Sequence, residues 1–553
     1  MRVVRAACLM AACLTASTGF APAAGPVDDY PRRIGIDVEH YRFELTLSDR
    51  TDRIEGRATV TVRFRANGVA ELPLDLTGMT AEGLGMTVDA VESGGRPLDF
   101  RHDADVVTIG LTPAGRSGER RSVTVTYAGT PVSGLRAGPN RHGDRTFFSD
   151  NWPNRARHWL PTIDHPYDKA TSEMLVTAPS HYQVVSNGLL VEETDGPDGT
   201  RLTHWRQSVP IATWLYVLGV ARFAVQHVDD FRGAAIQTWV YPQDRDAGFH
   251  DFAVPTKQAM EFYHDRVGPF AYEKLANVTS PVTGGGMEAA TAIMYHESSV
   301  TGERSVRWRN VIIHEVAHQW FGNAVTESDW DDVWLSEGFA TYFTLLFIEH
   351  AYGRDEFVAG LRSSADRVFQ QYDDDPDYRI VHDDLEDMSR VTTGAIYQKG
   401  SWVLHMLRSM VGDEAFWSGI RAYYARHMNA NATTEDFQRA MEEASGLDLA
   451  PFFDQWLYNG GNPKLEGWWD YDPTARAVRV ELNQTQAAGP VFRLPLEIGL
   501  YFDGEALPRR VETHAVDQRF NRLVIPVDAE PSGVTLDPNV RLLFQADFGH
   551  RTP

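Results

Sequence analysis

The 553-residue sequence predicts a multidomain α+β protein, because its length exceeds the roughly 100–200 residues that are typical of one domain. Apolar and polar residues alternate before residue 240 and again after residue 465, as in half-buried antiparallel strands. Between these regions apolar residues recur at helical spacing. We therefore expect a β domain over 28–240, a mostly helical domain over 241–460 and a small β-sandwich over 465–550.

Alternation of apolar and polar residues places the strands of the first domain. It is clearest at 41–47 and 58–64, where every second residue is apolar. Turn sequences such as Ser186-Asn187-Gly188 separate the strands. Shorter strands are expected at 123–127, 183–185 and 214–220.

The central region has helical spacing and clear boundaries. Thr433-Thr434-Glu435-Asp436 has the chemistry of a helix N-cap, and Asn459-Gly460-Gly461-Asn462-Pro463 breaks the pattern. The helices expected before this break are 257–265, 309–321, 338–351, 395–410 and 437–444, and the strands expected after it are 478–482, 494–502 and 522–527.

Composition is that of a globular protein that does not bind nucleic acid. Hydrophobic residues make up 43% of the chain and charged residues 23%, which is ordinary for such proteins. The net charge of −24 has the wrong sign for a phosphate-binding surface. Beyond the N-terminal segment no apolar run approaches the ~20 residues that cross a bilayer, so no transmembrane segment is expected in the mature chain.

The N-terminus has the pattern of a secretory signal peptide over 1–23. Arg2 and Arg5 precede a short apolar stretch at 6–16, and Ala21-Pro22-Ala23 offers a small-x-small cleavage site. We therefore expect an exported protein, either periplasmic or secreted.

Both cysteines of the chain lie inside this N-terminal segment, at Cys8 and Cys13. Cleavage near Ala23 would leave no thiol, and hence neither disulfides nor cysteine ligands for a metal. An alternative is a lipoprotein signal that ends at Met10-Ala11-Ala12-Cys13, in which the methionine is atypical.

The central region contains the pattern of a catalytic zinc site. In the run VIIHEVAHQWFGN, His314 and His318 are four residues apart, so on a helix they point the same way and can bind one metal ion. Glu315 lies about 100° round the helix, close enough to reach a metal-activated water. Glu337 follows 19 positions after His318 and can supply a third ligand. Two His and one Glu leave a fourth position open for water.

The residues around this trio favour a metal over a surface helix with two hydrogen-bonded histidines. They are apolar, which indicates a buried helix, and burying two histidines and a glutamate without partners is costly. One Zn²⁺ resolves that cost. The flanking apolar residues are Val311, Ile312, Ile313, Val316 and Ala317.

HEVAHQWFGN, followed by WLSEGFATY, resembles the aminopeptidase N family of zinc metallopeptidases, which are gluzincins and include the leukotriene hydrolases. Gly285–Ala289 resembles the family's G-x-M-E-N exopeptidase motif, and Tyr397–Gly400 its Y-x-K-G segment. The resemblance also extends to Ala156–Pro166 and Phe452–Trp456, and so spans nearly the whole mature chain.

The resemblance implies an N-terminal β saddle, a thermolysin-like catalytic domain and a C-terminal β-sandwich. Many family members add a C-terminal helical domain, which is not expected in this sequence. The implied activity is that of a zinc aminopeptidase acting on peptides with a free N-terminus. Oligomeric state and the preferred N-terminal residue leave no signal in the sequence.

The resemblance also implies roles for individual residues. His314, His318 and Glu337 are expected to bind zinc, and Glu315 to act as the general base. Tyr397 is expected to donate a hydrogen bond to the oxyanion that forms on the scissile carbonyl.

Substrate binding is expected to involve the exopeptidase motif. Glu288 would bind the free α-amino group by charge-assisted hydrogen bonds. Gly285, Gly286 and Met287 would let the backbone approach a peptide as an edge strand.

The sequence departs from the family pattern at two places. The Asn that follows the motif Glu is Ala289 here. The family's T-Q-x-E-like segment, which offers a second amine contact, corresponds to Ser149–Pro153, with Asp150 at the Gln position and Trp152 at the Glu position. We expect Asp150 to serve as the second contact.

Three alternatives remain at this stage. An epoxide hydrolase of the leukotriene hydrolase type would depend partly on the helical C-terminal domain. A catalytically silent peptide-binding homologue would usually have lost a ligand or the base, and all four residues are present. Endopeptidase activity is disfavoured by Glu288.

Overall fold

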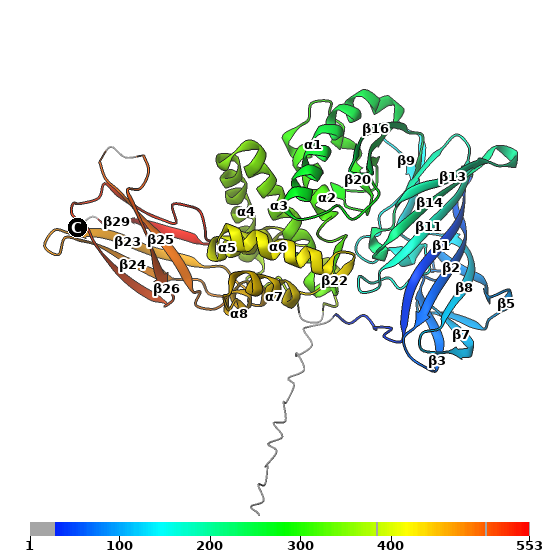
Figure 1. The fold of residues 1–553 in the computed structure, drawn as a ribbon, viewed down its shortest axis with the longest axis horizontal. Coiled ribbons are helices and arrows are strands. Elements are labelled where there is room, and N and C mark those ends of the chain that lie inside the picture. Colours follow the sequence, from blue (N-terminus) through cyan, green and yellow to red (C-terminus); the bar gives the residue numbers. More distant parts are fainter. Residues whose placement is uncertain (1–27, 383–384, 504–505, 552–553) are drawn as a thin grey trace, which may run out of the picture.

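The protein is an elongated molecule of three consecutive parts in a computed structural model that describes residues 28–382, 385–503 and 506–551 (Figure 1). Strands form one end, helices the middle and further strands the other end. This confirms the multidomain α+β class. The signal peptide predicted over 1–23, with Cys8 and Cys13, lies outside the described residues. No helix among the described residues is long and apolar enough to span a bilayer.

A large sheet dominates the first part, in the strand order β13-β14-β11-β1-β2-β8-β4-β5. Its central strands are buried on alternate residues, as the sequence pattern predicts, and β1 runs parallel to β11 but antiparallel to β2. The strands are β1 (Ile36–Ser48), β2 (Thr51–Phe64), β4 (Gly85–Ser93), β5 (Arg96–Pro97), β8 (Arg120–Thr130), β11 (Ala170–Pro179), β13 (Leu189–Asp195) and β14 (Thr200–Ile211).

Two smaller sheets complete this part, in the orders β3-β7-β6 and β12-β15-β10-β9. Their strands are β3 (Val69–Asp75), β6 (Phe100–Asp103), β7 (Val106–Gly115), β9 (Leu135–Pro139), β10 (Arg145–Ser149), β12 (Gln183–Ser186) and β15 (Leu218–Ala221).

The strand predicted at 214–220 is only half correct. Thr213–Leu215 forms a turn of 3-10 helix, and β15 begins at Leu218. The side chain of Asn187 explains the difference, because it donates to the Leu215 carbonyl at 2.9 Å and accepts from the Val217 amide at 2.9 Å. A buried amide thus satisfies backbone groups that a strand neighbour would otherwise pair.

A five-stranded sheet joins the first and middle parts, in the order β16-β17-β18-β20-β19. Parallel pairing of β17 with β18 links residues on either side of 240, so a domain boundary there would cut through one sheet. β19 stands at one end of this sheet order, beside β20, so Gly286 and Met287 form an edge strand. The strands are β16 (Ala224–Phe231), β17 (Ala234–Val240), β18 (Lys274–Ser280), β19 (Gly286–Met287) and β20 (Ala292–His296).

Helices fill the middle part, together with a short parallel pair formed by β21 (Val325–Glu327) and β22 (Ala430–Ala432). The capping prediction is confirmed, since Thr433 and Asp436 form a reciprocal capping box. The helices are α1 (Arg245–Arg266), α2 (Val306–His318), α3 (Trp334–Tyr352), α4 (Arg354–Asp374), α5 (Gly400–Val411), α6 (Asp413–His427), α7 (Thr434–Ser445) and α8 (Ala450–Phe453).

Two predicted helices have different ends. The helix predicted over 309–321 ends at His318, because the chain folds back so that the Asn323 amide donates to the His318 carbonyl at 3.1 Å. The helix predicted over 395–410 begins with a π-helical turn at Ala395–Lys399 before α5.

The last part contains two sheets, in the orders β27-β24-β23-β29 and β26-β25-β28. The strands predicted at 478–482, 494–502 and 522–527 correspond to β24, β25 and β27 within one or two residues. The strands are β23 (Lys464–Asp472), β24 (Ala477–Gln484), β25 (Leu494–Tyr501), β26 (Arg510–Val516), β27 (Phe520–Pro526), β28 (Gly533–Leu536) and β29 (Gln545–His550).

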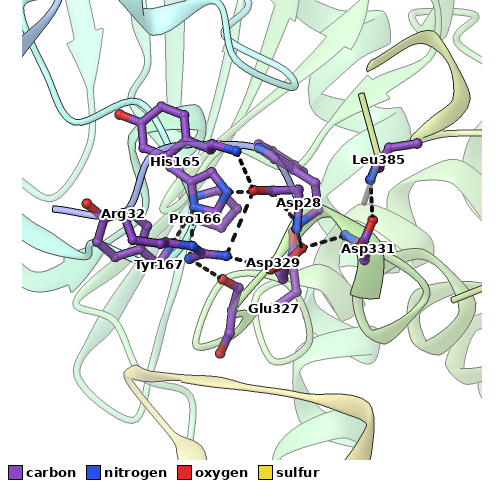
Figure 2. Close-up of polar contacts among 12 residues, drawn as sticks. Asp28, Arg32, His165, Pro166, Tyr167, Glu327, Asp329, Asp331 and Leu385 are labelled. Atoms are coloured by element: carbon purple, nitrogen blue, oxygen red, sulfur yellow. Dashed lines mark hydrogen bonds and ion pairs between the residues drawn. The ribbon is translucent and has the colours of Figure 1, made fainter. Parts of the chain in front are cut away.

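A buried polar network, here called the Asp28 network, ties the first described residues to the middle part (Figure 2). Asp28 accepts from His165 Nε2 at 2.7 Å and from the Trp330 amide at 3.2 Å. Asp329 accepts from Arg32 at 2.5 Å and from the amides of Asp28 and Asp331 at 3.0 Å each. We define the network as Asp28, Arg32, His165, Asp329 and Asp331. It fixes the loop that leads into α3.

Candidate active site

The predicted metal ligands come together at the contact between α2 and α3. His314 and His318 lie on the last turns of α2, and Glu337 lies in the first turn of α3. The two histidine Nε2 atoms are 3.0 Å apart. Glu337 Oε2 lies 3.4 Å from His314 Nε2 and 3.2 Å from His318 Nε2.

These three atoms have the spacing of tetrahedral zinc ligands. Zinc–nitrogen and zinc–oxygen bonds of about 2.0–2.2 Å place neighbouring ligand atoms about 3.3 Å apart. The three ligand atoms of His314, His318 and Glu337 lie 3.0 to 3.4 Å from one another. Two imidazole nitrogens and a carboxylate are also a donor set that zinc prefers. The side chains therefore fit one zinc ion.

Backbone and hydroxyl groups orient the imidazoles. His318 Nδ1 lies 3.1 Å from the Phe321 carbonyl and 3.1 Å from Ser336 Oγ, so its proton donates there and Nε2 faces the metal position. His314 forms a hydrogen bond with the backbone of Ala340. These partners were not predicted, because Phe321 and Ala340 act through backbone atoms, which carry no sequence signal.

A second acidic group adjoins the triad on the side of His318. Glu288, Glu315 and His318 form a cluster whose ligand atoms lie within 4.8 Å of one another. Glu288 and Glu315 are each 5% exposed, and Glu288 Oε1 and Glu315 Oε2 have no hydrogen-bond partner among the described residues. A Cβ placed on Gly286 would lie 2.1 Å from Glu315 Oε1, so glycine lets the edge strand β19 approach the carboxylate.

Two side chains that follow α2 hold the Glu288 backbone. Gln319 Nε2 donates to the Glu288 carbonyl at 3.0 Å, and Asn323 Nδ2 donates to the same atom at 2.7 Å. Gln319 Oε1 also accepts from the Thr291 amide at 3.1 Å. Sequence reasoning missed these roles, although both residues stand within the HEVAHQWFGN run that carries the metal motif.

Tyr397 reaches the triad from the π-helical turn. Its hydroxyl donates to Glu337 Oε1 at 2.9 Å, and its ring stacks on His314 with centroids 6.1 Å apart. Close approach of Gly338 and Gly400 permits this contact, because a Cβ on Gly338 would lie 3.0 Å from the Gly400 Cα. The extra residue of a π-turn shifts side chains round the axis, and such turns are frequent at functional sites.

The electrostatics of the cluster suit a bound cation. Burial alone would lower the pKa of His318, but Glu288 and Glu337 raise it to about 10. Burial would raise the pKa of Glu337, but His318 and His314 lower it to about 2. Burial, with neighbouring acids, raises the pKa of Glu288 to about 7 and that of Glu315 well above its usual range. A metal ion would displace the His318 proton and compensate the excess of acids.

Asp150 lies at the margin of this cluster, next to an arginine. It contributes to the raised pKa of Glu288, so the two carboxylates interact. Its Oδ2 lies 3.1 Å from Arg155 Nη2, and its Oδ1 accepts from the Trp152 amide at 3.3 Å. Burial raises the pKa of Asp150, while Arg155 opposes the shift. The partner Arg155 was not predicted.

Comparisons with known proteins identify the family. The model of the peptidase family M1 domain matches residues 253–456, and that of the peptidase M1 N-terminal domain matches 37–215. Together these two models of one family cover well over half of the chain.

Individual relatives agree with this assignment. The chain is similar to glutamyl aminopeptidase of Bos taurus, with 31% identity over 332 residues that cover 57% of this chain and 34% of that protein. It is similar to aminopeptidase N of Streptomyces lividans, with 28% identity over 81% of this chain and 53% of that protein. It thus spans about a third to a half of the length of these relatives.

A solved structure shows the same relationship in three dimensions. A mutant of the M1 zinc metallopeptidase from Deinococcus radiodurans has a TM-score of 0.65 and 27% identity, and the match covers 76% of this chain and 94% of that one. From the two family models, the relatives and this shared fold, it follows that the chain belongs to peptidase family M1.

Proposed function

We propose that this chain is a zinc-dependent aminopeptidase that releases N-terminal amino acids from peptides. The observation that carries the proposal is the position of the buried carboxylate of Glu288 beside a triad with zinc-ligand spacing. His314, His318 and Glu337 would hold one zinc ion. Relatives named glutamyl aminopeptidase and aminopeptidase N support the same activity.

The residues beside the triad supply the proton transfer. Bound zinc would polarise the scissile carbonyl and make water nucleophilic near neutral pH. Glu315 would take the proton of the attacking water and pass it to the leaving amine. The position of Glu315 supports this role, because its carboxylate lies in the cluster with Glu288 and His318 and Oε2 is free to accept.

Tyr397 would stabilise the charge that forms on the carbonyl oxygen. Its hydroxyl already points at the triad, where it donates to Glu337 Oε1 at 2.9 Å. A short swing from this acceptor would bring the hydroxyl to the oxyanion. Because this hydrogen bond would form only as charge develops, it would stabilise the transition state more than the bound substrate and so lower the activation barrier.

The exopeptidase preference would come from Glu288. Its carboxylate would bind the substrate's α-ammonium, while Gly285, Gly286 and Met287 would align the substrate backbone along β19. Asp150 would add a second contact to the ammonium, with Arg155 holding its carboxylate in place. An unchanged Michaelis constant for amino-acid anilides in Asp150→Ala would remove Asp150 from this scheme.

Hydrolysis of amino-acid anilides tests the proposal. A panel would be assayed beside N-acetylated versions, with and without a zinc chelator. Chelator-sensitive cleavage of the free-amine substrates alone is the expected result. Absence of cleavage by protein that carries one zinc would instead favour a peptide-binding role or an epoxide substrate.

Glu288→Gln separates exopeptidase from endopeptidase action. We expect this variant to lose its preference for free-amine anilides over N-acetylated ones, since the amide cannot form an ion pair with the ammonium. An unchanged preference would place the amine contact elsewhere.

We further propose that the chain is exported to the periplasm or secreted, on the strength of the signal pattern at 1–23. N-terminal sequencing of protein recovered outside the cytoplasm should begin at Ala24 or Gly25. An intact Met1 would contradict export by cleavage, and a lipid on Cys13 would favour the lipoprotein alternative.

A further inference from the structure

A pocket of about 530 Å³ opens beside the triad on the side of His314. Its walls come from α2, α3, α4 and the π-helical turn, and His314 and Tyr397 form its inner end. The side chain of His314 is 19% exposed and lines the pocket, whereas that of His318 is 1% exposed and does not line it. The pocket therefore adjoins the metal position on the side of His314.

The charge of this pocket is opposite to that of the chain. Arg307 on α2 and Arg367 on α4 line it, and no Asp or Glu does. The chain as a whole has 76 Asp and Glu against 52 Lys and Arg. Three other pockets formed by the described residues each combine arginines with at least two acids.

Neither arginine is neutralised by the protein. No ion pair or side-chain hydrogen bond joins Arg307 or Arg367 to another residue in the described parts of the chain. Arg307 instead lies over the ring of Trp308, 4.9 Å from its centroid, which leaves the edge of its guanidinium open. It also stands in the first turn of α2, where the helix dipole adds positive potential.

With the substrate amine bound at Glu288, this pocket would lie on the leaving-group side of the scissile bond. Glu288, the proposed amine contact, approaches the triad at His318, with Oε1 4.0 Å from Nδ1. The pocket approaches it at His314, and Glu288 is not among its lining residues. A peptide whose amino end lies at Glu288 and whose scissile carbonyl lies at the metal would continue into the pocket.

The distance from the triad to Arg307 sets the length of peptide that fits. Arg307 precedes His314 by seven residues on one helix, which is about 10 Å along its axis. An extended peptide advances about 3.5 Å per residue. A carboxylate about three residues beyond the scissile bond would therefore meet the guanidinium.

We propose that Arg307 and Arg367 bind a peptide carboxylate on the leaving-group side, so that the enzyme favours short peptides with an anionic group about three residues beyond the scissile bond. The carboxylate is either the free C-terminus or an acidic side chain at that distance. This inference rests on the proposed aminopeptidase function.

Matched tetrapeptides test the inference. X-Ala-Ala-Ala, with X the residue best accepted in the anilide panel, would be assayed as free acid and as C-terminal amide. In wild type we expect KM for the amide to be about five- to tenfold higher, with similar kcat. Arg307→Gln, Arg367→Gln and the double variant should raise KM for the free acid toward that of the amide. The difference should shrink at high salt.

Two controls separate this inference from the proposed function. The X-anilide carries no carboxylate, so Arg307→Gln and Arg367→Gln should change its KM far less than they change that of the free-acid peptide. Failure of wild type on the anilide would reject the proposed function itself. Arg362→Gln changes an exposed arginine of α4 that does not line the pocket, and it should leave all constants unchanged.

A third peptide distinguishes the two sources of carboxylate. X-Ala-Ala-Glu amide carries only a side-chain carboxylate. A KM as low as that of the free acid assigns the arginines to acidic side chains, and a KM equal to that of the alanine amide assigns them to the C-terminus. Equal KM for all three peptides, or a preference that survives in the double variant, would overturn the inference.

Discussion

Carboxylates are buried against imidazoles in two regions, the Asp28 network and the candidate metal site, which comprises His314, His318, Glu337 and the adjoining Glu288 and Glu315. The two regions differ in the hydrogen bonds that these carboxylates accept. In the network, Asp28 and Asp329 accept hydrogen bonds at both oxygens, from amides, His165 and Arg32 (Figure 2). At the metal site, Glu288 Oε1 and Glu315 Oε2 accept no hydrogen bond from the described residues. Glu337 Oε2 faces the two imidazole nitrogens of the metal motif, at 3.4 Å and 3.2 Å.

This difference in hydrogen bonding indicates which region is structural and which is built to bind a cation. A buried polar group without a partner costs about 1–3 kcal/mol, and more when it is charged. The Asp28 network avoids that cost within the chain and so holds the first described residues against the loop before α3. At the candidate metal site Glu288 Oε1 and Glu315 Oε2 remain buried without hydrogen bonds, and a metal ion and a substrate ammonium would offset the energetic cost.

Removal of the metal gives the largest expected effect and tests the comparison directly. Chelation should abolish hydrolysis of amino-acid anilides. Zinc at a thousandfold excess over its Kd should then restore about 4 kcal/mol of stability, measured as a rise in Tm. His318→Ala should not respond to zinc. A wild-type Tm that does not change when zinc is added would show that these residues do not bind zinc in the folded protein.

Replacement of the proposed base comes next. Glu315→Gln should lower kcat by a factor of about 10²–10⁴, because an amide cannot accept the proton, while the bound zinc remains. Steady-state kinetics beside metal analysis of the purified variant give the two readouts. Wild-type kcat in a zinc-loaded variant would assign the base to another residue.

The tyrosine of the π-turn should contribute less. Tyr397→Phe removes one hydrogen bond to the oxyanion, and we expect kcat to fall about 10²-fold with little change in KM. A rise in KM alone, at unchanged kcat, would place the hydroxyl in substrate binding instead.

Disruption of the Asp28 network should affect stability and not chemistry. Asp28→Ala leaves His165 and the Trp330 amide without an acceptor, and breaking such a buried pair costs about 3–5 kcal/mol. We expect Tm to fall by several degrees, with kcat at 25 °C retained. Asp29→Ala, at the exposed neighbour, is the matched control. Lost kcat in folded Asp28→Ala would show that the network also shapes the site.

The smallest expected effect is a change in pH dependence. Burial lowers the pKa of His165 to about 4, so its contribution to stability is complete above pH 6.5 and is lost as pH falls toward 4. Burial and Asp28 raise the pKa of Asp329 to about 6, so its protonation favours the folded state as pH falls from about 6 to 3.8.

These two contributions oppose each other in wild type. Asp329→Asn removes the contribution of Asp329, which stabilises the folded state as pH falls. The Tm of this variant should therefore decrease more steeply than that of wild type as pH is lowered from 6.5 to 4. Thermal unfolding across this range gives both slopes. Parallel slopes would mean that Asp329 does not titrate there.

Features that depend on neighbouring residues in the chain could be predicted from the sequence. The four-residue spacing of His314 and His318 places both on one face of α2, and alternation places β1 and β2. The capping box at Thr433 was likewise predictable, because cap and partner are three residues apart.

Features that depend on contacts between distant segments could not be predicted. The π-helical turn before α5 depends on the approach of Gly338 to Gly400, and the sheet across residue 240 depends on β17 pairing with β18. The salt bridge between Arg155 and Asp150 could not be predicted either, because no local sequence pattern indicates which way either side chain points.

Anomalous diffraction at the zinc edge, from crystals grown with zinc, tests the central claim most directly. The account predicts one peak within about 2.0–2.2 Å of His314 Nε2, His318 Nε2 and Glu337 Oε2, and none at the Asp28 network. A map without that peak at full zinc loading, or with its peak among Asp28, His165 and Asp329, would contradict it.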